Sequence, residues 1–263
     1  MLLAKMRRIR RKGANAVRGI KRFVLLGLVA LCVIAPAAHA GPPFQTDDPE
    51  PVDFKHWEAY VFSTMFRAGG SYATFGPAIE INTGALPNLQ LHLVVPMAGN
   101  IPDTGLNGYG IGDIEMGVKY RFVQEGKHMP QIGIFPMLEA PTGDPHLGLG
   151  NGQLWARLPL WIQKSSGPWT TYGGAGYAIN NAPGALSYPF GGWLVQRDLG
   201  KKLTLGVEVF GQGPDTTLSR SATFADAGGY YYFTKNFQLL FSAGHTFAGE
   251  ARAEAYLGLY WTW

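Results

Sequence analysis

Strict alternation over the last thirteen residues constrains this chain more than any other feature. The positions on one side of the alternation are all apolar: Ala251, Ala253, Ala255, Leu257, Leu259, Trp261 and Trp263. The positions between them carry charged, hydroxyl, aromatic or glycine residues, beginning with Arg252 and Glu254. A period of two is that of a β-strand, and thirteen residues is long for a soluble sheet. The pattern predicts a strand long enough to cross a membrane at a tilt.

The same alternation recurs upstream with charges on one side. Ile114, Met116, Val118, Tyr120 and Phe122 alternate with a second set, which is Asp113, Glu115, Gly117, Lys119 and Arg121. In a soluble sandwich the charged face would meet water and the apolar face would pack on a second sheet. In a membrane barrel the charged face lines the lumen and the apolar face meets lipid.

Twelve such segments lie between turn signals. They are 56–66, 74–84, 88–97, 111–124, 130–140, 153–163, 169–179, 188–198, 202–211, 222–233, 236–246 and 251–263. Short connections alternate with mostly longer ones, as in outer-membrane barrels, and aromatic residues gather near segment ends, as in interfacial girdles. Aromatic packing in a sandwich core is the alternative. We predict an all-β fold, a transmembrane up-and-down antiparallel β-barrel of about 12 strands with both termini periplasmic.

The first forty residues have the order of a secretory signal peptide. Nine Lys and Arg precede Phe23, an apolar run of thirteen residues follows, and Ala38-His39-Ala40 comes before Gly41. The run is shorter than the roughly 18 residues of a membrane-spanning helix. We therefore predict a cleaved signal peptide over 1–40, a periplasmic N-terminal segment or plug over 41–55, and an outer-membrane barrel over 56–263.

Removal of that leader reverses the net charge. All 18 Asp and Glu lie after Gly41 but only thirteen of the 22 Lys and Arg do, so the remaining chain carries −5 rather than +4. The basic balance therefore does not indicate nucleic-acid binding. The single cysteine, Cys32, lies in the leader, which leaves no disulfide or thiolate site after cleavage.

Parity along the strands also predicts which side chains face the lumen. The pore-lining candidates are Glu58, Glu80, Asp113, Glu115, Lys119, Arg121, Glu139, Arg157, Glu208, Asp226, Arg252 and Glu254. Opposite charges among them can form cross-strand ladders, because a low dielectric strengthens their attraction. These charges either form a selectivity lining for polar or aromatic solutes or satisfy one another in a closed, salt-bridged interior.

The head of the exported chain is rich in proline and acids, which argues against helix or strand. It either folds into the lumen as a plug, with Phe44, Asp47 and Asp48 as the plug candidates, or forms a disordered tail. Acid spacing alone is weak evidence for a bound cation, so no metal or cofactor is predicted. The glycine-rich loop 141–152 either folds inward and narrows the pore or stays on the surface.

Three motifs carry a family resemblance. Thr46-Asp47-Asp48-Pro49 opens the exported chain, residues 110–115 lead into Lys119-Tyr120-Arg121-Phe122, and Pro141-Thr142-Gly143-Asp144 precedes Gly148-Leu149-Gly150. In this order they resemble the MetA-pathway of phenol degradation family of outer-membrane transporters. The resemblance spans nearly all of the chain after the leader and implies membrane passage more firmly than it implies phenol as the solute. It transfers no functional residue set.

These observations favour an outer-membrane channel or transporter for small, aromatic or hydrophobic solutes, and not an enzyme. A lipid-acting barrel enzyme and a structural or adhesive barrel are the alternatives. An enzyme would place its Ser and His together at the outer rim, whereas Ser242 and His245 fall on opposite faces by parity. The expected partners are outer-membrane lipid, a small solute and the β-barrel assembly machinery. Trp263 is the candidate assembly signal, and a monomer is the default.

Overall fold

The structure is a computed structural model, and it describes residues 42–263. The predicted signal peptide, residues 1–40, lies outside these described residues. Residues 42–263 fold almost entirely into β-strands, and the short 3-10 helix η1 spans Pro145–Leu147. Within residues 42–263 no helix is long and apolar enough to cross a membrane.

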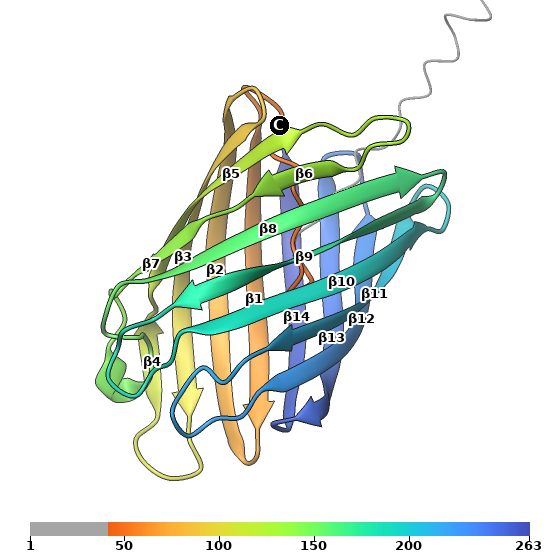
Figure 1. Cartoon of the computed structure of the whole chain (residues 1–263). Coiled ribbons are helices and arrows are strands. Elements are labelled where there is room, and N and C mark those ends of the chain that lie inside the picture. Colours follow the sequence, from red (N-terminus) through yellow and green to blue (C-terminus); the bar gives the residue numbers. More distant parts are fainter. Residues whose placement is uncertain (1–41) are drawn as a thin grey trace, which may run out of the picture. The chain divides into compact units, whose positions relative to one another are not determined.

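The strands follow one another along the chain as antiparallel neighbours. Their bounds are β1 Trp57–Ala68, β2 Ser71–Leu86, β3 Leu89–Ile101, β4 Gly108–Ile111, β5 Ile114–Val123, β6 Gln131–Ile134, β7 Met137–Ala140, β8 Trp155–Ser166, β9 Trp169–Ile179, β10 Tyr188–Asp198, β11 Leu203–Gln212, β12 Ala222–Tyr232, β13 Phe237–Gly249 and β14 Arg252–Thr262. β1 pairs with β14 from Glu58 opposite Thr262 to Ala68 opposite Arg252. This last pairing closes the sheet into a barrel (Figure 1).

Two of the strands are each broken into two pieces. β4 and β5 both pair with β3, and β6 and β7 both pair with β8. The fourteen pieces therefore make twelve strands, which confirms the predicted fold class. The second break falls at Phe135-Pro136, where proline lacks the N–H that a ladder needs. The first break falls at Gly112-Asp113, where the Asp113 side chain accepts hydrogen bonds from loop 141–154.

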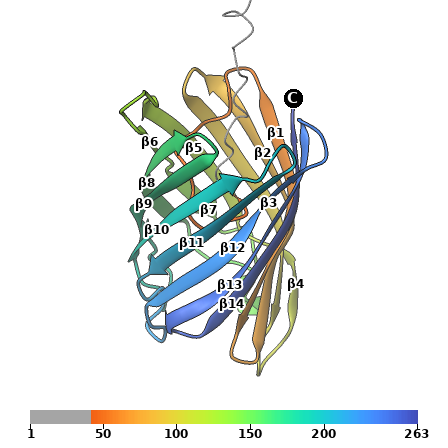
Figure 2. The same cartoon turned by 90° about the vertical axis from the view of Figure 1, so that its right-hand side faces the viewer.

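The connections sort by length to the two ends of the barrel. The end that carries the C-terminus has the connections 87–88, 124–130, 167–168, 199–202 and 233–236. The opposite end has two tight turns and four longer loops, 102–107, 141–154, 180–187 and 213–221 (Figures 1 and 2). We call this opposite end the loop end.

The two faces of the barrel wall differ as the alternation predicts. The outer face exposes aliphatic side chains along the middle of the strands, for example Ile79, Val95, Val207 and Leu257. Exposed aromatic side chains lie at both ends of this band. At the C-terminal end they are Trp57, Tyr120, Phe122, Trp169, Tyr231, Phe233 and Trp263, and toward the loop end they are Tyr72, Tyr109, Tyr177 and Phe247. Such a surface has the arrangement of a lipid-facing band with two aromatic girdles.

Candidate functional site

The stretch that precedes β1 runs inside the barrel (Figure 1). We call residues 42–53 the N-terminal segment. Its Phe44, Thr46, Asp48 and Val52 side chains are buried, although the segment forms neither helix nor strand. Apart from local bonds accepted by Asp47, Asp48 and Asp53, its hydrogen bonds go to side chains of the barrel wall more than 30 residues away in sequence. The barrel therefore does most to fix its path.

Carboxylates of the wall hold the head of the segment. Glu208 on β11 accepts hydrogen bonds from the backbone N–H of Gln45, at 3.0 Å, and from that of Thr46. Glu254 on β14 accepts a bond of 2.7 Å from the Gln45 side-chain amide. Ser242 on β13 donates its hydroxyl to the Pro43 carbonyl at 2.6 Å. Four hydrogen bonds from β11, β13 and β14 therefore hold the head of the segment in place.

Ion pairs hold the middle of the segment. Lys119 Nζ on β5 lies 3.0 Å from Asp47 Oδ1 and 3.4 Å from Asp48 Oδ1. Burial raises the pKa of the Asp48 carboxyl above its usual value, and the positive charge of Lys119 opposes that rise. The Lys119 ammonium also lies over the Phe135 ring, 4.9 Å from its centroid.

A belt of buried glutamines on the wall holds the rest of the segment through three of its members. Gln131 and Gln163 each donate to one Glu50 oxygen at 3.0 Å, and Gln90 accepts from the Val52 N–H at 2.9 Å. Gln196 and Gln238 are the other buried glutamines of the belt. Arg121 lies 3.8 Å from Glu50 and donates to Gln131 at 2.9 Å. Amide side chains suit these contacts, because the NH2 group donates to a carboxylate and the amide oxygen accepts from a backbone N–H.

Glycines on the wall make room for the segment. A Cβ at Gly206 would lie 3.1 Å from the Phe44 ring, and one at Gly133 would lie 3.0 Å from the Pro49 Cβ. A Cβ at Gly192 would collide with the Thr46 hydroxyl. Inward-facing glycines therefore shape the wall to the segment, in addition to leaving space in the lumen.

A second polar network, remote from the segment head, centres on His92 of β3. One ring nitrogen lies 2.7 Å from Asn82 Oδ1 and the other lies 2.8 Å from Glu115 Oε1. Glu80 is 3.5 Å from the ring and accepts a bond from Asn82. Sequence reasoning named both acids but missed His92 as their link. The alternation along β3 places His92 on the inner face, opposite Gly117 of β5, and this pattern could have identified it.

The twelve pore-lining candidates all have side chains on the inner face. They do not form the cross-strand ladders of opposite charges that were expected. Like charges, not opposite ones, stand across strand pairs: Glu208 is opposite Asp226, and Glu115 is opposite Glu139. Glu58 accepts hydroxyl hydrogen bonds from Tyr260, at 2.6 Å, and from Tyr60. The acids therefore rely mainly on neutral donors, His92 or the segment rather than on ladders.

Asp113 serves a loop instead of the open lumen. Its two oxygens accept the backbone N–H groups of Gly143, at 2.9 Å, and Asn151, at 2.6 Å. Leu149 from the same loop is buried, and a Cβ at Gly110 would lie 3.2 Å from it. Loop 141–154 is thus tied to the wall at the break between β4 and β5.

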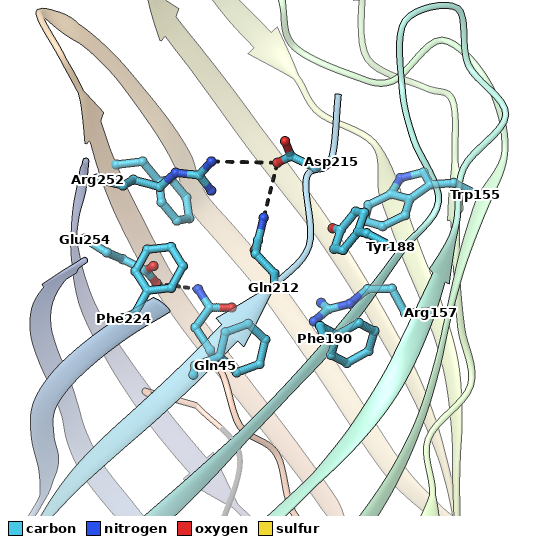
Figure 3. A pocket seen from close by; sticks show the side chains of 12 residues that line it. Gln45, Trp155, Arg157, Tyr188, Phe190, Gln212, Asp215, Phe224, Arg252 and Glu254 are labelled. Atoms are coloured by element: carbon cyan, nitrogen blue, oxygen red, sulfur yellow. Dashed lines mark hydrogen bonds and ion pairs between the residues drawn. The ribbon is translucent and has the colours of Figure 1, made fainter. Parts of the chain in front are cut away.

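A cavity of about 190 Å³ opens above the segment head, toward the loop end. Figure 3 shows its two facing walls, and Gln45 of the segment is part of its lining. One wall carries Trp155, Arg157, Tyr188 and Phe190, and the other carries Phe224, Arg252 and Glu254. Arg252 pairs with Asp215 of loop 213–221 at 3.7 Å. We call this space the vestibule cavity.

Two further sequence-based points concern enzyme and metal sites. Ser242 is buried in the lumen with its hydroxyl on the Pro43 carbonyl, whereas His245 is exposed; the parity prediction that they point apart holds. Among residues 42–263 no group of three or more His, Cys, Asp or Glu is placed to hold a metal ion.

The comparisons with known proteins agree with this fold. The outer-membrane channel COG4313 from Pseudomonas putida F1 superposes with a TM-score of 0.65 and 15% identity, covering 82% of this chain and 98% of that one. The NanC porin gives a TM-score of 0.55 and 9% identity over 77% of this chain and 98% of the porin. The translocator domain of the autotransporter NalP from Neisseria meningitidis gives 0.54 and 11%, over 80% and 89%. No curated protein sequence matches this chain.

A family model establishes the family membership, which these distant structures do not establish. The model described as "Putative MetA-pathway of phenol degradation" matches residues 58–262, which is the whole barrel from β1 to β14. This match agrees with the resemblance carried by the sequence motifs. The chain belongs to the MetA-pathway of phenol degradation family.

Proposed function

We propose that this protein is an outer-membrane channel for small solutes whose lumen is closed by its own N-terminal segment. The observation that carries the proposal is the placement of residues 42–53 inside a twelve-stranded barrel, on side chains contributed by strands all around the wall. The apolar outer band and its aromatic girdles support a position in the outer membrane. The family match supports the same assignment.

The proposal of a channel rests on the difference in structure between the N-terminal segment and the barrel wall. The wall is a continuous hydrogen-bonded ladder, whereas the segment has no regular structure and is held by side chains. Side-chain contacts break without opening the sheet, so the segment is able to leave while the barrel stays intact. Barrels of twelve strands lie between those filled by side chains and those with wide pores, which fits a narrow passage for small solutes.

In this proposal the C-terminal end faces the periplasm and the longer loops face outward. Solutes then enter the vestibule cavity from outside and meet the segment as its floor. Lipid surrounds the barrel, the assembly machinery inserts it, and the working unit is one chain. The charged inward positions line the passage when the segment is displaced.

Conductance across a planar bilayer tests the proposal. We expect residues 41–263 to give little or no steady current and a variant without residues 41–52 to give a steady one. Current from both proteins would refute closure by the segment. Silence from both, together with liposomes impermeable to small solutes, would refute the channel itself.

A lipid-acting enzyme is the second candidate, and the placement of Ser242 and His245 argues against it. A nucleophile needs its base within hydrogen-bond reach, and these two residues are on opposite faces of β13. Loss of a lipid-hydrolysing activity on His245→Ala would revive this candidate.

A further inference from the structure

Arg157 lines the vestibule cavity, and no carboxylate among the described residues accepts a hydrogen bond from its guanidinium. Arg157 on β8 lies with its guanidinium over the Phe190 ring, 4.9 Å from the centroid. Its charge acts on Glu115 and Glu139, yet within residues 42–263 no hydrogen bond or ion pair within 4.0 Å engages its side chain. A guanidinium stacked by its face keeps the N–H groups at its edge available.

The acids that line the same cavity are already engaged. Glu254 accepts the Gln45 amide at 2.7 Å. Asp215 pairs with Arg252 at 3.7 Å and accepts from Gln212 at 3.3 Å. Of the four charged side chains that line the cavity within residues 42–263, Arg157 is therefore the one that no hydrogen bond or ion pair engages, and as a cation it suits an anionic partner.

The Phe190 ring reaches the wall beside Arg157 because Gly176 has no side chain to block it. Phe190 on β10 is separated from β8 by β9, where Gly176 stands opposite Phe190. A Cβ at Gly176 would lie 2.6 Å from Phe190 Cζ, so the ring crosses β9 only because that side chain is missing. Tyr188 and Trp155 line the same side of the cavity, and Phe224 faces them (Figure 3).

The size of the cavity restricts what it can take. Its volume is about 190 Å³, and an apolar protein cavity of about 150 Å³ holds one benzene molecule. One aromatic ring with a small substituent therefore fits, and a fused two-ring solute does not without movement of the walls.

From these observations we propose that the vestibule cavity binds single-ring aromatic carboxylates, with the ring among Phe190, Tyr188 and Phe224 and the carboxylate on the free edge of Arg157. This inference rests on the proposed channel function and names the solute class that its outer chamber selects. A carboxylate accepts two parallel N–H bonds from one guanidinium, which fixes the orientation of the ring. Aromatic walls supply the apolar contact.

Three probes that share one ring and differ in charge test the proposal: benzoate, benzyl alcohol and benzylamine. Binding to the detergent-solubilised chain 41–263 is measured by titration calorimetry, which requires no open pore. Hydrogen bonds to charged groups are stronger than neutral ones, so we expect benzoate to bind at least about tenfold more tightly than benzyl alcohol. Benzylamine should bind most weakly. Equal affinities for the three probes, or no benzoate binding, would overturn the proposal without any variant.

The variant Arg157→Gln assigns the effect to one side chain. It should lower benzoate affinity to that of benzyl alcohol and leave benzyl alcohol binding unchanged. Arg197→Gln is the matched control, since Arg197 also stacks on an aromatic ring, that of Trp169 at 5.0 Å, but is exposed on the outer face. Benzoate affinity unchanged in folded Arg157→Gln would also overturn the proposal. Should that variant fail to fold, Arg157→Lys replaces it, with an intermediate loss expected.

The binding result separates this inference from the channel proposal. Benzoate binding with no current from any form of the protein refutes the channel and retains the site. Current from the truncated protein with no benzoate binding retains the channel and refutes the site.

Discussion

Replacement of Lys119 by Met is the sharpest test of how the segment is held. Met keeps most of the length and volume of the side chain and removes only its charge. Lys119 contacts both Asp47 and Asp48, and the three side chains are 5%, 19% and 1% exposed. The substitution leaves two carboxylates in the lumen without their cation, whereas water hydrates both of them once the segment is released.

The magnitude follows from the burial of this cluster. Removing one partner of a buried ion pair costs about 3–5 kcal/mol. Because the barrel wall does not depend on the segment for its ladder, we assign this cost to the equilibrium between seated and released segment. At about 1.4 kcal/mol for each factor of ten, the released population rises by roughly two to three and a half powers of ten.

Two measurements check this expectation. Single-channel recording should give frequent openings for Lys119→Met where the parent protein is silent, and protease should cut residues 42–53 faster in the variant. The triple variant Lys119→Met, Asp47→Asn, Asp48→Asn should return toward silence. Lys164→Met is the matched control: Lys164 pairs with Glu125 at 2.7 Å and does not touch the segment.

The same variant should respond to pH. Burial raises the pKa of Asp48, and Lys119 opposes that rise, so the pKa of the seated Asp48 rises further in Lys119→Met. The released residue keeps its ordinary value of about 3.9. A group with the higher pKa in the seated state favours seating at low pH and loses that contribution as the pH rises. The variant should therefore open less often at about pH 4, near that released value, than at neutral pH.

One outcome would refute the reasoning. If folded Lys119→Met stays silent at both pH values and its residues 42–53 resist protease as they do in the parent protein, the ion pairs do not hold the segment. Closure would then depend on the backbone contacts of Glu208 and on the glutamine belt.

Three further predictions concern other contacts. Gly192→Ala should raise channel opening because its methyl collides with the Thr46 hydroxyl, whereas Gly211→Ala, where the nearest atom is 3.8 Å away, should leave the recordings unchanged. Glu208→Ala removes the acceptor of one buried and one partly buried backbone N–H group, at up to about 1–3 kcal/mol each, and faster proteolysis of the segment is expected; an unchanged rate would contradict it. Trp263→Ala should reduce the amount of barrel inserted in cell outer membranes while refolding in detergent proceeds normally, and equal levels in cells would exclude Trp263 as an assembly signal.

The strands were predictable because each one repeats a local pattern. Alternation between an apolar outer face and a polar inner face needs no knowledge of the neighbours, and it yielded twelve strands. The ends were less accurate at the loop end, where the ladder continues beyond the apolar band: β1 reaches Ala68 and β3 reaches Ile101, beyond the predicted ends at 66 and 97. Beyond the apolar band, side chains on the outer face need not be apolar. The alternation in the sequence therefore ends before the strand ends.

The path of the segment was not predictable in the same way. Parity placed Glu208 and Glu254 on the inner face, but nothing local links them to Gln45, which lies 163 and 209 positions away in the chain. Prolines and acids at the head were equally compatible with a disordered tail. The vestibule aromatics were missed for a related reason, because Phe190 reaches Arg157 across β9 only through the missing side chain of Gly176.

The charges of the lumen were expected either to line a passage or to neutralise one another, and the contacts of the segment connect the two possibilities. Lys119 and Arg121 on β5 meet acids of the segment, while Glu208 on β11 and Glu254 on β14 meet its N–H donors. With the segment seated, both sets are satisfied by a removable partner. When the segment leaves, a cationic wall on β5 faces water together with an anionic wall on β11 and β14. In our proposal the closed interior and the charged lining are therefore two states of the same residues, and displacement of the segment converts one into the other.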